Sequence, residues 1–97
     1  MSYEALLEDE SDIFGGTPQS KYWDIASQVS QDLYRHEFDQ MVQKMAVMER
    51  MLMEQYDEEI LDRVIESHYL ENMSDVEMHK KSLYMELAGI LIYKMAD

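Results

Sequence analysis

The side chains best suited to metal binding or acid–base catalysis are three histidines, His36, His68 and His79. His68 and His79 each follow a glutamate by two positions, whereas di-iron helical bundles use a Glu-x-x-His spacing. The chain has no cysteine, which excludes thiolate zinc sites, disulfides and cysteine nucleophiles. Three glycines are too few to build a phosphate-binding loop. The sequence therefore predicts no enzyme activity, no metal site and no cofactor.

Net charge narrows the classes of partner. The chain carries a net charge of −13, which repels nucleic-acid phosphates and anionic membranes. The most apolar run, residues 83–96, contains Glu86 and Lys94 and is shorter than the roughly 20 residues that a bilayer needs. The first residues lack the basic and apolar regions of a signal peptide. We therefore expect no direct nucleic-acid or membrane binding and a cytoplasmic location (the host cytoplasm for a virus-encoded protein).

Acidic side chains gather in residues 1–17 and 57–73, which each sum to −5. In and beside the second block, acids repeat every four residues, about 6 Å apart along a helix: Glu54, Glu58, Asp62 and Glu66. Such like-charge neighbours cost a helix a few tenths of a kcal/mol each. This acidic ridge has three readings: a solvated face that keeps the protein soluble, a docking face for a basic protein groove, or a mimic of nucleic acid.

Helical periodicity sets the expected architecture, which is all-α. Thr17 and Pro18 are typical of a helix start. The apolar stripe beyond them predicts one long helix over about 18–56, because no Gly or Pro interrupts it. A second amphipathic helix is expected over about 58–72, after a turn near Tyr56-Asp57. The chain would then form a small helical hairpin or three-helix bundle over residues 17–97.

A third helix is predicted over about 75–95. Ser74 and Glu77 have the spacing of a capping box, in which each side chain accepts the backbone N–H of the other residue. Gly89 lies inside this helix, where it costs about 1 kcal/mol relative to Ala and suggests a close approach of another helix.

Ten methionines are unusual in a chain of this length, and several lie on the long predicted helix. Methionine fills irregular gaps in cores and also suits adaptable binding surfaces. Both readings stay open for an apolar face that consists of Trp23, Phe38, Met41, Met45 and Met48. Part of this face steps by four and three residues, as in a coiled-coil seam.

Residues 1–16 are expected to form an acidic tail that is flexible alone or ordered by a partner. Apolar residues interleave with its acids, as in segments that fold on binding: Leu6, Leu7, Ile13 and Phe14. The alternative is a frayed terminus with stray apolar residues.

Together these features predict a non-enzymatic protein–protein interaction module. It would be a small acidic adaptor, accessory factor or inhibitor, of a kind that viruses encode, docking on a larger protein or assembly with a basic surface. Two alternatives remain: a structural subunit of a virion or another complex that packs against copies of itself, and a DNA mimic that inhibits a nucleic-acid-binding protein.

Overall fold

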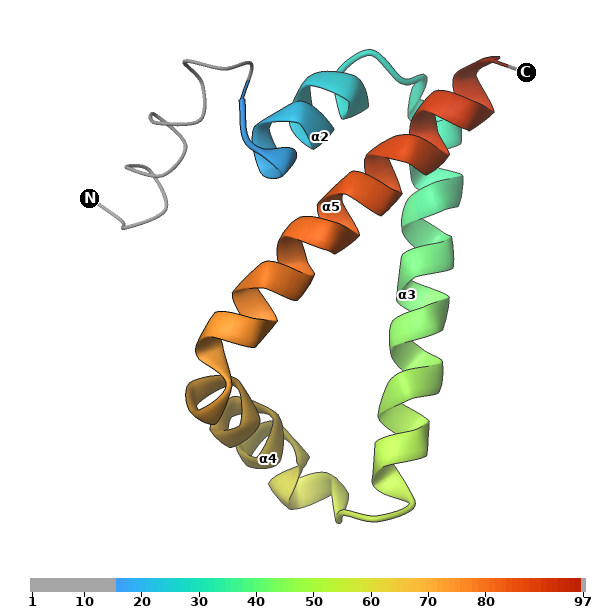
Figure 1. Ribbon diagram of the computed structural model, residues 1–97. Coiled ribbons are helices and arrows are strands. Elements are labelled where there is room, and N and C mark those ends of the chain that lie inside the picture. Colours follow the sequence, from blue (N-terminus) through green and yellow to red (C-terminus); the bar gives the residue numbers. More distant parts are fainter. Residues whose placement is uncertain (1–15, 97) are drawn as a thin grey trace.

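The computed structural model describes residues 16–96, and these confirm the all-α prediction. Four helices follow one another (Figure 1): α2 Pro18–Ala26, α3 Gln31–Met53, α4 Glu58–Glu71 and α5 Met73–Ala96. The start at Thr17 is as predicted. The Thr17 side chain accepts the Ser20 N–H at 3.0 Å, and the Ser20 hydroxyl accepts the Thr17 N–H at 2.9 Å. This reciprocal cap satisfies two N–H groups that a helix start otherwise leaves unpaired.

The prediction of a single long helix over 18–56 is wrong, because the first helix ends at Ala26 and a second begins at Gln31. The Gln28 N–H bonds to the Ile25 carbonyl, which closes a tight turn, and Ser30 then starts a new helix. The Ser30 side chain caps α3 by accepting the Leu33 N–H at 3.2 Å. The turn lets α2 fold back onto α5, as Figure 1 shows, while α3 runs in another direction.

The predicted turn near Tyr56-Asp57 is confirmed, since α3 ends at Met53 and α4 begins at Glu58. The predicted capping box at Ser74 is wrong, because α5 already begins at Met73. Only Asn72 departs from helical geometry, with φ −129° and ψ 33°. The Val76 N–H bonds to the Asn72 carbonyl, so the new helix starts two residues before the position that the motif indicated.

The main core lies where α2 crosses α5. Among the described residues, Leu91 is the most deeply buried, with 2% of its surface exposed, and it joins Tyr22 and Ala88. Tyr84 and Leu87 of α5 and Tyr34 of α3 pack against this cluster. Gly89 makes no close approach, because a Cβ added there would meet nothing within 4 Å. The suggestion that it admits a neighbouring helix is therefore wrong.

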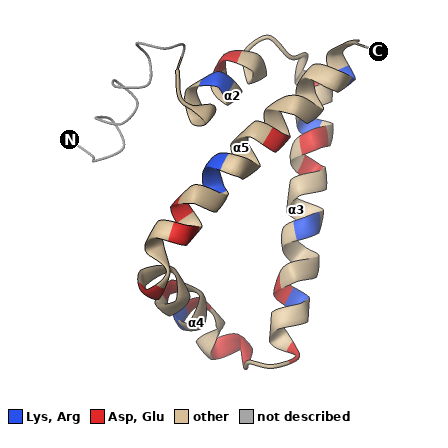
Figure 2. Ribbon diagram, in the orientation of Figure 1, with Lys and Arg blue, Asp and Glu red and all other residues tan. Residues whose placement is uncertain are grey.

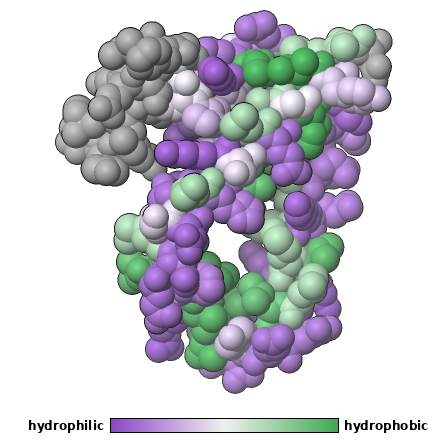
Figure 3. Space-filling model, viewed as in Figure 1, coloured by the Kyte–Doolittle hydropathy of each residue, from purple (hydrophilic) through white to green (hydrophobic). Residues whose placement is uncertain are grey.

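Beyond that core, α3, α4 and α5 form the sides of an open triangle (Figure 1). The space-filling view in Figure 3 shows an opening through the molecule between these helices, with apolar side chains along its lower border. In this part of the chain only Leu61 is a buried hydrophobic residue. The fold thus has one compact corner and two long helices that diverge from it.

Candidate interaction surface

The apolar residues predicted as a binding face divide into two groups. Trp23, Phe38 and Met41 line a groove of 330 Å³ between α2, α3 and α5. We call this the aromatic groove; its other main walls are Tyr22, Leu83 and Tyr84. Trp23 and Phe38 are about half exposed there, at 51% and 52%. The sequence therefore located one wall of the groove but not the α5 residues that face it.

Tyr22 and Trp23 are neighbours in sequence but have opposite environments. Tyr22 is buried, and its ring meets Trp23 edge-on with centroids 5.0 Å apart and Tyr84 at 5.6 Å. Burial raises the pKa of the Tyr22 hydroxyl, and its hydrogen bond to the Tyr34 hydroxyl raises it further. Tyr22 therefore stays neutral and anchors the core. Trp23 presents its open face to the groove.

Met48 lies apart from the aromatic groove, in a hollow of 490 Å³ on the inner side of the triangle. We call this the central hollow; it is lined by Met48 of α3, His68 of α4 and, from α5, chiefly Val76, His79 and Leu83. Leu83 and Lys80 line both depressions and separate them. Met45 is 53% exposed on the same helix.

Helix α3 leaves a row of large apolar side chains exposed. It is 23 residues long, yet none of its residues is buried by the rest of the described chain. Its apolar side chains are exposed instead, with Met51 at 61% and Met48 at 48%. These exposed side chains do not contribute the stabilisation of about 1.5–3 kcal/mol that burying each large apolar side chain would provide. Contiguous exposed apolar patches are frequent at protein interaction sites.

The acidic ridge is shorter than its spacing suggested. Glu54 is the C-cap of α3 and lies outside α4, so only Glu58, Asp62 and Glu66 share one helix. All three are exposed. Helix α4 carries five acids and one base, whereas α3 carries four acids and three bases. Negative charge is therefore concentrated on α4, where Figure 2 shows acidic residues along the helix.

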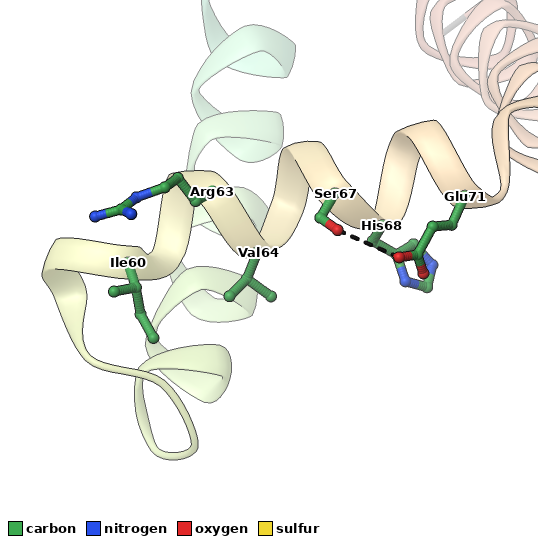
Figure 4. A pocket seen from close by; sticks show the side chains of 6 residues that line it. All are labelled: Ile60, Arg63, Val64, Ser67, His68 and Glu71. Carbon is green, nitrogen blue, oxygen red and sulfur yellow. Dashed lines mark hydrogen bonds between the residues drawn. The ribbon is translucent and has the colours of Figure 1, made fainter.

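A further depression, on α4 alone, contains a serine, a histidine and a glutamate, the residue types of a hydrolytic triad, but not the hydrogen bonds of one. Figure 4 shows that Ser67, His68 and Glu71 all come from α4 and line an open surface with Ile60 and Val64. The Ser67 hydroxyl donates a hydrogen bond to Glu71 Oε1 at 3.4 Å. It therefore does not donate to the His68 imidazole, as a serine nucleophile would donate to its general base. Residues 16–96 hold no group of three or more potential metal ligands.

The predicted tail residues Leu6, Leu7, Ile13 and Phe14 lie outside the described residues. Within residues 16–96, no helix combines the length and apolarity needed to cross a membrane.

Comparison with known proteins places the chain in a family. It belongs to the family described as a domain of unknown function, DUF2018, whose model matches residues 14–95. A search of curated proteins and a search of solved structures each found no match.

Proposed function

We propose that this member of the DUF2018 family is a non-enzymatic protein–protein interaction module whose α3 face is completed by a second copy of the chain. One observation carries the proposal: a 23-residue helix with an apolar seam buries none of its residues. A long helix draws most of its stability from tertiary packing of such a face. The chain therefore lacks a partner surface that another protein would supply.

Charge favours a second copy as that partner. Helix α3 has a net charge of −1 and α5 a net charge of 0. Two copies can therefore bring these helices together without the repulsion that a total charge of −13 would otherwise cause. The acids of α4 would remain in water. The contact would be the same patch on both copies, as in most homodimers.

A buried carboxylate oxygen adds support. Glu37 of α3 lies close to the aromatic groove, and its Oε2 atom is buried without a hydrogen bond among the described residues. His36 Nε2 lies 3.7 Å from this oxygen, which is beyond hydrogen-bond distance. An unsatisfied buried oxygen costs about 1–3 kcal/mol. A donor from a second chain would remove that cost.

Charge placed on the seam tests the proposal. Met45→Glu combined with Met48→Glu puts two carboxylates on the exposed apolar face and should abolish self-association in sedimentation velocity. The matched control is Gln43→Glu, which adds a carboxylate on the opposite side of α3. It should leave association intact. Equal effects of the two variants would show that α3 does not form the contact.

Docking on a larger basic protein is the second candidate, and the exposed acids of α4 favour it. Glu58 and Glu66 are about 12 Å apart along the helix, which suits a basic groove better than mimicry of a long DNA backbone. A partner captured from the native host should be lost with Glu58→Lys plus Asp62→Lys and above about half-molar salt. It should be retained by Asp32→Lys plus Asp39→Lys, which change the charge equally on α3.

A further inference from the structure

We infer that the aromatic groove binds the apolar residues of the chain's own N-terminal segment, residues 3–14. The groove lies where α2, α3 and α5 meet; it shares Phe38 and Met41 with the apolar face of α3, whereas Met45 and Met48 lie outside it. Its occupant is identified by the chemistry of the groove, by the point where the described chain begins, and by charge.

The groove has the chemistry of a site for an apolar segment. Trp23, Phe38 and Leu83 line it, and they leave 51%, 52% and 38% of their total surface exposed to solvent. Rigid aromatic side chains of this kind are frequent anchors of binding sites. Lys80 is the charged residue in its lining, and it also forms an ion pair with Glu77 at 3.4 Å.

The N-terminal segment is both apolar and acidic, so it matches the apolar lining of the groove and its lysine. It contains Tyr3, Leu6 and Leu7 at steps of three and one, followed by Ile13 and Phe14. It also carries five acids and no base. Lys80 lines the groove. An acidic segment lying in the groove would have this cation beside its carboxylates.

The segment also joins the fold next to the groove. Gly16 has φ 95°, a backbone conformation that turns the chain immediately before α2 and favours glycine. From Gly16 to Tyr22 the path along α2 is about 9 Å. Leu7 can span about 30 Å from Gly16 and so can reach the groove, whereas the backbone of Phe14 spans only about 7 Å. A tether this short gives an effective concentration in the millimolar range, which favours the segment over a separate peptide.

Trp23 is the only tryptophan of the chain, so its fluorescence reports on the groove directly. The experiment uses the full chain with four substitutions, Leu6→Ser, Leu7→Ser, Ile13→Ser and Phe14→Ser. None of them alters a residue of the described fold, and circular dichroism checks that the helices remain. The matched control is Ser2→Ala with Ser11→Ala, which changes the segment but keeps its apolar residues. Acrylamide is the quencher, because it is neutral and the five acids do not repel it.

Loss of the apolar residues should raise the acrylamide quenching constant about twofold, because the open half of the indole would become accessible, and should shift the emission to longer wavelength. The control should match the parent, and the difference should not change with protein concentration. Identical quenching of parent and fourfold variant overturns the inference. Shielding that survives in the variant and grows with concentration also overturns it, because a second copy would then occupy the groove. Because Phe38 and Met41 of α3 also line the groove, sedimentation velocity of the same samples reports self-association separately.

Discussion

The Tyr69 hydroxyl on α4 donates a 2.9 Å hydrogen bond to Glu77 Oε2 on α5. This contact joins the two helices across Asn72, where the chain bends. The hydrogen bond from Tyr69 is the main reason that the pKa of Glu77 lies below its ordinary value of 4.5, and Lys80 lowers it further. The carboxylate that the capping motif assigned to Ser74 is therefore used to hold the angle between α4 and α5.

This contact predicts a pH dependence. Because the pKa of Glu77 is depressed in the folded chain, its contribution to stability is complete above pH 4.5 and is lost as the pH falls through the lower folded value. Tyr69→Phe removes the largest cause and should make the urea midpoint less sensitive to acid below pH 4.5 than in the parent chain. Tyr93→Phe, at a side chain that is 70% exposed, is the control and should follow the parent. Equal acid sensitivity of Tyr69→Phe and the parent would count against the assignment.

Leu91 should be the most sensitive position of the core. Leu91→Ala empties a site that is only 2% exposed and should lower the free energy of unfolding by about 3 kcal/mol. Its neighbour Ile92 is 51% exposed, and Ile92→Ala should cost about 1 kcal/mol or less. Both are measured by urea unfolding at one protein concentration, because association would shift the apparent stability. A larger cost at Ile92 would mean that the α2–α5 corner is not the principal core.

The break between α2 and α3 should depend on Ser30. Ser30→Ala removes the side chain that accepts the Leu33 N–H and should cost about 1 kcal/mol. The same change at Ser82, an exposed residue inside α5, should be neutral or slightly stabilising, since alanine is the better helix former. Thermal unfolding followed by circular dichroism gives both signs. A Ser30 variant as stable as the parent would show that the cap is dispensable.

Two glycines should respond in opposite directions to one substitution. Gly89→Ala should stabilise α5 by about 0.5–1 kcal/mol, because nothing obstructs a methyl group there and alanine restricts the unfolded chain. Gly16→Ala should destabilise by about 1 kcal/mol, because its φ of 95° is unfavourable for a residue with a Cβ. The melting temperatures of the two variants should lie on either side of that of the parent. Shifts of the same sign would contradict this account of the backbone.

The sequence predicted the helical class, the Thr17 start and the turn before Glu58 because each depends on local patterns. It missed the break at residues 27–30, where no Gly or Pro occurs. Two signals were present there: Ser30 stands three residues before Leu33, as an N-cap does, and the apolar stripe shifts by one residue at Tyr34. Both signals lie in the first turn of α3, which begins at Gln31.

The remaining errors have tertiary causes. Ser74 and Glu77 satisfy a local motif, but Tyr69 competes for the Glu77 carboxylate from a neighbouring helix. Sequence spacing also placed Trp23 and Met48 on one continuous face, whereas Leu83 and Lys80 of α5 separate the surroundings of these two residues. Which residues of α5 would face α3 depended on the angle between the helices, and no periodicity within a single helix specifies that angle.

Self-association through α3 is tested most directly by the mass of the unmodified chain in solution. Sedimentation equilibrium over a hundredfold range of concentration should give a dimer that dissociates toward the 11.6 kDa chain on dilution. The Met45→Glu, Met48→Glu variant should have the mass of one chain at every concentration, whereas Gln43→Glu should match the unmodified chain. A mass of one chain at every concentration would contradict the proposal and would leave the apolar face of α3 to a different partner.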